Sequence, residues 1–148
     1  MREHLLTEAR KAALKAYAPY SKFRVGAALR VTTPDGVSHI VTGVNVENAS
    51  FGLALCAERN ALAAACTSYC IPPQHPHSGH IAERPLITHL AVACIDALSG
   101  LPANHKMPCG ACRQWFAELA PGAIFYVDGI DQDLSLDDLF PLAFRLEQ

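Results

Sequence analysis

Three cysteines of the chain have the spacing of metal ligands. Cys109 and Cys112 form a Cys-x-x-Cys pair where a helix is expected to begin, and Cys56 stands upstream at the start of another expected helix. The dipole and the free N–H groups of a helix N-terminus favour anions, so thiols at these positions ionise readily and become available as ligands. Three thiolates can hold zinc tetrahedrally and leave one position open, which is typical of a catalytic site.

Glu58 lies two residues after Cys56, in the first turn of the same expected helix. Its carboxylate can therefore lie near the metal without binding it and can take a proton from water that zinc has made acidic. Each motif alone has a plain structural explanation, because Cys-x-x-Cys is also a redox pair or two core thiols, and a Glu near a helix start is often only a cap. Together with Pro108 before the second pair, the motifs match the Cys-x-Glu and Pro-Cys-x-x-Cys signature of zinc-dependent deaminases.

The elements that must position these residues alternate along the chain. Apolar residues recur at helical spacing until Pro19, β-branched runs indicate strands, and Pro121-Gly122 ends a late helix. The alternation predicts an α/β fold of three layers, α/β/α, with a mixed central sheet of about five strands whose later strands are parallel. The predicted helices are 2–18, 55–65, 110–119 and 136–139, and the predicted strands are 23–32, 40–46, 87–95 and 123–127.

Residues 1–148 are expected to form a single domain with a surface insertion at 67–85, where prolines and a glycine break every period. The insertion contains Cys70 and three histidines, His75, His77 and His80. A second metal site is conceivable from that composition, but the irregular spacing and the lack of a second cysteine pair favour incidental histidines. Elsewhere, Cys66 and Cys94 have apolar neighbours in the sequence and are interpreted as small buried residues.

The composition excludes several classes of function. The chain has 148 residues, 51% hydrophobic and 18% charged, with a formal net charge of -2 and a pI of about 6.4. This near-neutral balance lacks the basic patches of nucleic-acid binders, so no nucleic acid is expected as a partner. No stretch reaches the roughly 18–20 apolar residues of a membrane span, and the charged N-terminal stretch is unlike a signal peptide. A cytoplasmic protein is expected, in which cysteines serve metal binding or catalysis rather than disulfides.

Several segments together resemble the small, homotetrameric cytidine deaminases, and the similarity continues to residues 139–144. The resemblance implies a cytidine deaminase-like fold with one zinc ion per chain. It also implies hydrolytic deamination of cytidine and 2′-deoxycytidine to uridine and 2′-deoxyuridine with release of ammonia, as in pyrimidine salvage. The segments that carry the resemblance are FRVGAAL at 23–29, GVNVENAS at 43–50, CAER at 56–59 and PCGACRQ at 108–114.

The resemblance also implies a role for each residue of the site. From the residues alone, Phe23 is equally explained as a core aromatic on a strand, and Asn45 and Glu47 share one strand face that could simply face solvent. Arg59, otherwise an exposed helix cation, would offset the negative charge of three thiolates, which weakens the ability of zinc to acidify water. The implied roles are zinc ligands for Cys56, Cys109 and Cys112, proton shuttle for Glu58, pyrimidine packing for Phe23, ribose binding for Asn45 and Glu47, substrate binding for Ala57, a hydrogen bond to the thiolates for Arg59, and contact with a neighbouring subunit's substrate for Phe51 and Phe144.

Three positions depart from the family pattern. Phe51 stands where a tyrosine is usual, Asn60 replaces a threonine and Met107 replaces a serine. These changes are expected at the pocket rim, where they leave the zinc chemistry intact and leave open how the sugar 5′ end is recognised. One alternative is therefore a deaminase of a modified cytosine nucleoside such as blasticidin S. Another is a zinc-stabilised binding module without turnover, in which His105 or His89 closes the metal site.

Overall fold

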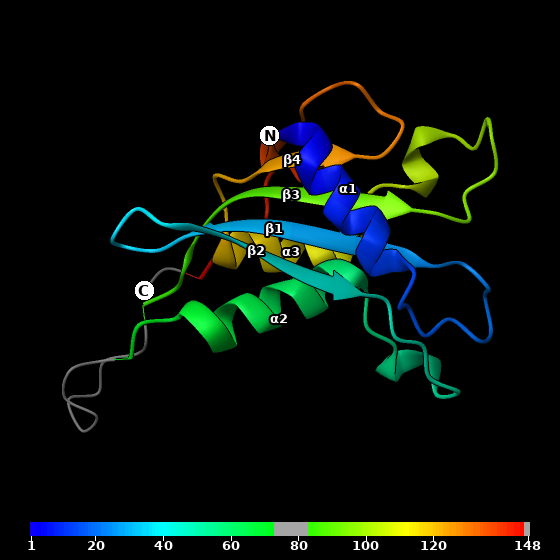
Figure 1. Cartoon of the computed structure of the whole chain (residues 1–148), viewed down its shortest axis with the longest axis horizontal. Helices are drawn as coiled ribbons and strands as arrows, with labels where there is room; N and C mark the ends of the chain where they lie inside the picture. The colour runs from blue at the N-terminus through cyan, green and yellow to red at the C-terminus, as the bar shows by residue number, and fades with distance from the viewer. Residues whose placement is uncertain (73–82, 147–148) are drawn as a thin grey trace.

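The computed structural model describes residues 1–72 and 83–146 and centres on one sheet (Figure 1). Within these residues the sheet has four strands in the order β2-β1-β3-β4, so the expected count of about five is wrong. β1 pairs antiparallel with β2 and β3, whereas β4 is parallel to β3, which confirms a mixed sheet. The strands are β1 (Val25–Thr32), β2 (Ser38–Val44), β3 (Leu86–Cys94) and β4 (Ile124–Val127).

As far as residue 146, the chain after β4 forms no further strand, because α4 starts two residues after Leu134, the residue that returns to pair with β4. Phe125 and Leu134 make an isolated antiparallel bridge. Directly afterwards, Ser135 and Asp138 form a capping box, in which each side chain bonds the other residue's backbone N–H and so fixes the start of α4. This local helix signal ends the pairing after a single bridge.

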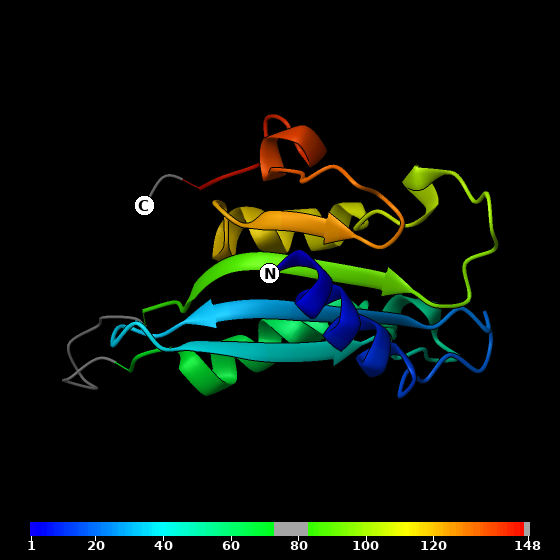
Figure 2. The same ribbon diagram turned by 45° about the horizontal axis from the view of Figure 1, so that its top comes forward.

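Helices cover both faces of the sheet, which confirms the predicted three layers. Figures 1 and 2 show α1 on one face and α2 with α3 on the other. Side chains of β1 alternate accordingly: Leu29 packs in the core under α2 and α3, and Ala28 packs against α1. The helices are α1 (Arg2–Ala13), α2 (Ala57–Tyr69), α3 (Gly110–Leu119) and α4 (Leu136–Leu139), with 3-10 turns η1 (Phe51–Leu53) and η2 (Ala103–His105).

Two glycines let helices lie directly against the sheet backbone. A Cβ atom at Gly26 of β1 would stand 2.0 Å from the carbonyl oxygen of Ala9 in α1. A Cβ atom at Gly43 of β2 would stand 2.4 Å from both the carbonyl oxygen of Ala57 and the amide nitrogen of Ala61 in α2. Gly43 therefore sets how closely the first turn of α2 approaches the sheet.

The first helix is shorter than the predicted 2–18, because the chain turns after Ala13 to pair with the segment that follows β2. The N–H of Tyr17 donates to the carbonyl of Asn45 at 3.1 Å, and the N–H of Glu47 donates to the carbonyl of Tyr17 at 2.8 Å. This pairing over a long sequence distance replaces the last helical turn that the apolar spacing predicted.

The second helix is longer than predicted and continues to Tyr69, so the predicted insertion at 67–85 begins inside a helix. The prediction for His75, His77 and His80 lies outside the described residues. Among the helices of the described chain, none has both the length and the apolar character to cross a membrane.

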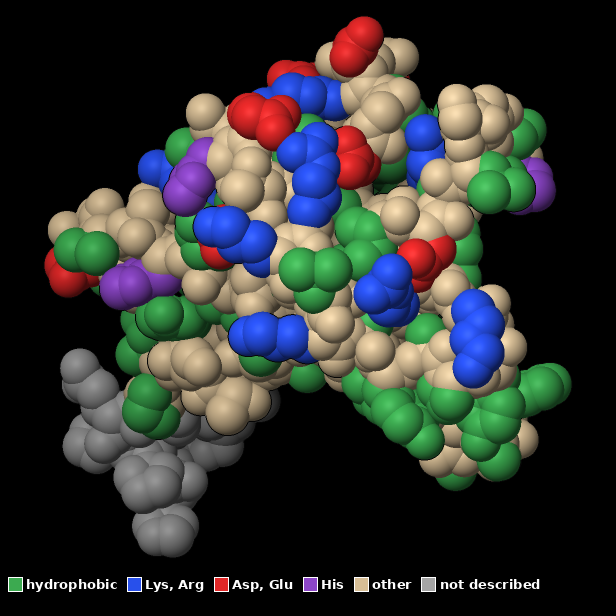
Figure 3. All heavy atoms as spheres, turned by 45° about the vertical axis from the view of Figure 1, so that its right-hand side comes forward, with side chains coloured by type: hydrophobic (Ala, Val, Ile, Leu, Met, Phe, Trp, Pro, Cys, Tyr) green, Lys and Arg blue, Asp and Glu red, His purple; other side chains and the backbone are tan. Residues whose placement is uncertain are grey.

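One corner of the surface is rich in exposed hydrophobic side chains. Figure 3 shows them gathered around η1. Phe51 is 81% exposed and Leu53 is 67% exposed, although both are large apolar residues. Apolar patches on a soluble protein often mark an interaction surface.

Candidate active site

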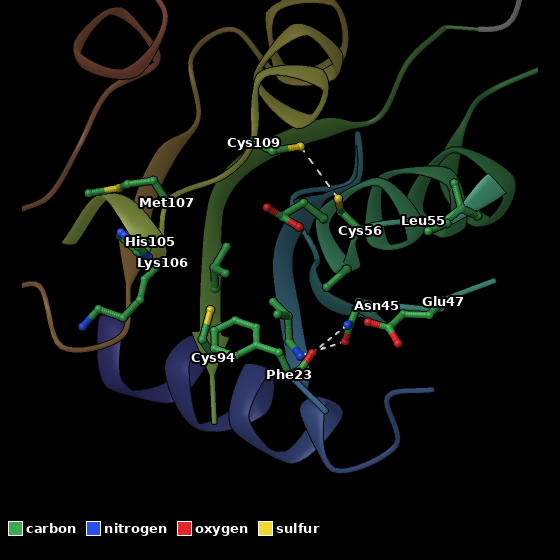
Figure 4. Close-up of a pocket in the computed structure, with 15 residues that line it drawn as sticks. Phe23, Asn45, Glu47, Leu55, Cys56, Cys94, His105, Lys106, Met107 and Cys109 are labelled. Carbon is green, nitrogen blue, oxygen red and sulfur yellow. Dashed lines mark hydrogen bonds between the residues drawn. The ribbon is translucent and has the colours of Figure 1, made fainter. Parts of the chain in front are cut away.

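The structure brings the three predicted ligand cysteines together. The Sγ atoms of Cys56, Cys109 and Cys112 all lie within 4.8 Å of one another. Cys56 and Cys109 are 3.7 Å apart (Figure 4), and Cys109 and Cys112 are 3.5 Å apart. Cys56 is the N-cap residue of α2 and Cys109 that of α3, and neither side chain caps its own helix. Both thiols are therefore left for the cluster, at the positive ends of two helix dipoles.

The cluster fits zinc in both donor type and size. Thiolates bound to one tetrahedral zinc at about 2.3 Å lie about 3.8 Å apart, close to the observed sulfur separations. Thiolates are also the soft donors that zinc sites commonly use. Among the described residues, neither His89 nor His105 belongs to this group, so neither closes it as a fourth ligand.

Neighbouring groups stabilise the thiolate form of Cys56. Hydrogen bonds from Cys112 and then from Arg59 lower the pKa of Cys56 to about 5, although burial opposes the shift. The guanidinium Nη2 of Arg59 lies 3.8 Å from the Cys56 sulfur and 3.2 Å from the carbonyl oxygen of Ala54. The structure thus places the guanidinium of Arg59 against one of the three thiols, that of Cys56.

Glu58 lies in the first turn of α2 and is only 5% exposed. Burial raises its pKa to about 7, and the negative charge of Cys56 acts in the same direction. A carboxyl group with a pKa near neutrality can both accept and return a proton under physiological conditions. Its position beside the thiols gives the cluster an acid–base group that need not bind the metal.

A cavity of 270 Å³ opens over Cys56, Glu58 and Cys109. Phe23, Asn45 and Glu47 line it, and Figure 4 shows them on the side away from Cys109. Ala57, the remaining predicted substrate contact, also lines the cavity and is fully buried. The structure thus places every predicted substrate-binding residue around one cavity.

Phe23, Asn45 and Glu47 lie in loops rather than on strands, contrary to the expected strand positions. Phe23 precedes β1, while Asn45 and Glu47 follow β2. The Asn45 side chain donates to the carbonyl of Phe23 at 2.9 Å and accepts from the N–H of Val25 at 2.8 Å. Asn45 therefore holds the backbone on both sides of Arg24 in addition to facing the cavity.

Sequence reasoning missed several residues of the cavity wall. Cys94 was expected to be buried, yet it is half-buried and lines the cavity, and burial raises its pKa to about 11. Cys66 is also only half-buried. His105, the last residue of η2, and Lys106, which follows it, form part of the wall. The available signal for Cys94 was its place at the carboxyl end of β3, the sheet edge where α/β folds commonly bind ligands.

The departures from the family pattern lie in different places. Met107 lines the cavity as expected. Asn60 does not, because its side chain donates to the carbonyl of Val44 at 2.7 Å and ties α2 to β2, so its placement at the rim was wrong. Phe51 lies in η1 and lines a neighbouring hollow that shares Glu47 and Ala54 with the cavity. Phe144 is 66% exposed next to α3, where its carbonyl accepts from Gln114 at 2.9 Å.

Three clustered thiols beside a buried carboxyl group at a cavity define the class of site used by metal-dependent hydrolases. The family described as "Cytidine and deoxycytidylate deaminase zinc-binding region" matches residues 1–128. This chain belongs to that cytidine and deoxycytidylate deaminase family.

Individual relatives agree with this assignment over nearly the whole chain. A protein named cytidine deaminase from Halalkalibacterium halodurans is 37% identical over 99% of this chain and 96% of its own length. One from Mycobacterium tuberculosis is 40% identical over 94% of this chain and 86% of its own length. The crystal structure of cytidine deaminase from Burkholderia pseudomallei superposes with a TM-score of 0.73 at 38% identity, covering 97% of this chain and 99% of that one.

Proposed function

We propose that the protein catalyses the hydrolytic deamination of cytidine and 2′-deoxycytidine to uridine and 2′-deoxyuridine, with release of ammonia. One observation carries the proposal: a buried carboxyl group, Glu58, adjoins a three-thiol cluster at the floor of a nucleoside-sized cavity. Membership of the deaminase family supports the same reaction.

Cys56, Cys109 and Cys112 would hold one zinc ion per chain, with Arg59 stabilising the thiolate of Cys56. When bound, zinc supplies Lewis-acid chemistry that makes water acidic enough to react near neutral pH. The N-termini of α2 and α3 favour the negative charge of the ligand set. Arg59 and the two helix N-termini therefore stabilise the negative charge of the thiolates whether or not a substrate is bound.

Glu58 moves the protons of the reaction. Its carboxylate takes a proton from the attacking water as the oxygen adds to C4 of the pyrimidine, and the resulting acid protonates N3. The Glu58 carboxylate then takes the proton of the new C4 hydroxyl and delivers it to the amino nitrogen as the C4–N bond breaks, so that ammonia leaves and the C4 carbonyl forms. A pKa of about 7 suits Glu58 to both directions of transfer.

The remaining residues of the cavity orient the nucleoside. Phe23 packs against the pyrimidine ring, Asn45 and Glu47 hydrogen-bond the ribose, and Ala57 lies beside the base. Their common place around the cavity supports these roles. Asn45 keeps one N–H and one oxygen lone pair free after its two backbone bonds, so it can still bind a sugar hydroxyl.

The decisive experiment replaces Glu58 with glutamine and follows the ultraviolet change on incubation with cytidine. Glu58→Gln should keep metal content and thermal stability but lose about 10²–10⁴-fold in turnover, because an amide cannot shuttle protons. Glu118→Gln, the same change at an exposed position of α3, is the matched control and should leave turnover unchanged. A Glu58→Gln variant with more than about a tenth of normal turnover would contradict the assigned role.

The same assay separates the alternatives. Turnover of blasticidin S without turnover of cytidine would favour a deaminase of modified nucleosides, and zinc binding without any turnover would favour a binding module. The relatives described above are named cytidine deaminases, which favours neither alternative. The binding module also lacks support because, in the described chain, His89 and His105 stand apart from the thiols.

The protein further acts as a homotetramer in the cytoplasm, with the whole chain, 1–148, as one catalytic domain. Phe51 and Phe144 would contact a neighbouring subunit, which is supported by exposures of 81% and 66% and by their absence from the wall of their own cavity. All six cysteines are free thiols, as suits a reducing compartment. Sedimentation at the assay concentration tests the assembly, and a fully active monomer would contradict it.

A further inference from the structure

Ser21 connects two residues of the proposed substrate site. Its hydroxyl donates a hydrogen bond to Oε1 of Glu47 and accepts one from the backbone N–H of Phe23 at 3.0 Å. The backbone N–H of Ser21 donates to Oε2 of Glu47 at 3.2 Å. One serine therefore contacts both the carboxylate on the sugar side of the cavity and the backbone of the aromatic residue on the base side.

The carboxylate of Glu47 is oriented mainly by this short segment. Oε2 accepts from two backbone N–H groups, those of Tyr20 at 2.9 Å and of Ser21. Oε1 accepts from the Ser21 hydroxyl. Because each carboxylate oxygen has two lone pairs, Oε1 retains one acceptor position for a ligand hydroxyl. The Ser21 hydroxyl thus orients Oε1 of Glu47, the carboxylate oxygen that can still accept a hydrogen bond from a ligand hydroxyl.

The backbone beside Ser21 has a conformation that its surroundings must impose. Lys22 has a φ of 59°, in the left-handed region that residues other than glycine adopt rarely. Its N–H donates to the carbonyl of Ala18 at 3.1 Å, and the next residue, Phe23, is held by Ser21 on one side and by Asn45 on the other. The Ser21 hydroxyl is one of the contacts that keep the 20–23 segment in this shape.

We propose that Ser21 is a positioning residue for sugar recognition, whose hydroxyl aims Oε1 of Glu47 at the sugar hydroxyls while it holds the backbone of Phe23 in place. This inference rests on the proposed function, since it assumes that Glu47 binds the sugar. Ser21 acts through Glu47 and Phe23 and touches no reacting atom.

The test compares two substrates that differ only in the groups that Glu47 would bind. Ser21→Ala should raise KM for cytidine about tenfold, the loss expected when one hydrogen bond to a charged group is removed, and should change kcat less than about twofold. KM for 2′,3′-dideoxycytidine, which lacks the 2′- and 3′-hydroxyls of the sugar, should change less than about threefold. A disturbance of the cavity in general would raise both KM values alike.

Two further variants complete the design. Ser21→Thr retains a hydroxyl and should restore KM for cytidine to near the wild-type value, which keeps the test valid if Ser21→Ala folds poorly. Ser38→Ala removes a hydroxyl on β2 that accepts from Arg30, remote from the cavity, and should alter neither KM.

If the wild type deaminates cytidine and Ser21→Ala has the same KM for cytidine as the wild type, the proposed role of Ser21 is overturned, while the proposed function stands. Equal KM increases for both substrates, or a Ser21→Thr variant as impaired as Ser21→Ala, would overturn it as well. A wild type that does not deaminate cytidine would overturn the proposed function and, with it, the role of Ser21.

Discussion

Substitution of Gly43 by alanine should displace active-site residues of α2, because Gly43 lies in the sheet directly against the backbone of that helix. The added Cβ atom would lie 2.4 Å from the carbonyl oxygen of Ala57 and 2.4 Å from the amide nitrogen of Ala61. Both are backbone atoms, so no side-chain rotation relieves the clash. Relief requires the first turn of α2, which carries Glu58 and begins after Cys56, to move away from the sheet.

The size of the movement follows from the contact distances. Ordinary contacts of a Cβ atom begin near 3.4 Å, so α2 must retreat by about 1 Å at this point. Overpacking of this kind costs about 1–3 kcal/mol of stability. A misplacement of about 1 Å can also reduce catalysis about 10²-fold, and metal–ligand distances tolerate only about 0.2 Å. Gly43→Ala should therefore lose both metal affinity and about 10²-fold in kcat/KM.

Gly26→Ala is the matched control. Its Cβ atom would lie 2.0 Å from the carbonyl oxygen of Ala9, so the variant overpacks α1, on the face of the sheet away from α2. We expect comparable destabilisation by thermal melting, with metal content per folded chain and kcat/KM within about threefold of wild type at a temperature where both variants are folded. Equal losses of activity in the two variants, or a fully active Gly43→Ala, would refute the argument that Gly43 sets the position of the site.

Two other predictions concern the metal ligands and acid stability. Cys112→Ser should lose zinc and stability, whereas Cys70→Ser should keep one zinc per chain by metal analysis; two zinc ions per chain would contradict this division. Arg10 donates to both carboxylate oxygens of Asp128, at 2.8 and 2.7 Å, and thereby lowers the pKa of Asp128. The pKa of Asp128 in the folded state lies below its unfolded value of about 3.9. The ion pair with Arg10 therefore stabilises the fold above about pH 4, and this contribution is lost as the pH falls through the folded-state pKa of Asp128. Arg10→Met should therefore reduce the free energy of unfolding by about 0.5–1 kcal/mol at pH 7 and by less near pH 2, measured in urea; equal losses at both pH values would rule out the ion pair as the cause.

The sequence was most informative where the signals are local. Pro108 before Cys109 and Pro121-Gly122 after the helix define a segment whose predicted bounds coincide with those of α3. The bounds predicted for the short helix 136–139 are also those observed for α4. In both cases a few neighbouring residues determine the start of the helix, so no knowledge of the tertiary structure is needed.

The errors arise where distant segments meet. Tyr17 continues the apolar spacing of α1 but pairs with the chain after β2, which no local pattern indicates. Cys94 is chemically suited to a core, and only the arrangement of β3 beside the cavity makes it part of the wall. The second hydrogen-bonding role of Asn45, to the backbone around Phe23, likewise depends on two loops meeting. Residue type could suggest the members of the site but not these supporting contacts.

The separation of the thiols along the chain has a consequence for synthesis in the cell. Cys56 and Cys109 adjoin each other in space yet are 53 residues apart in sequence. A ribosome that adds about 5–20 residues per second needs roughly 3–10 s to pass from one to the other. During that interval the nascent chain presents α2 and a single thiol of the cluster, which cannot retain zinc as a complete set of ligands does. Metal loading should therefore begin only after the ribosome has added Cys109 and Cys112, and the rate of zinc uptake from that point should report the docking of α3 beside α2.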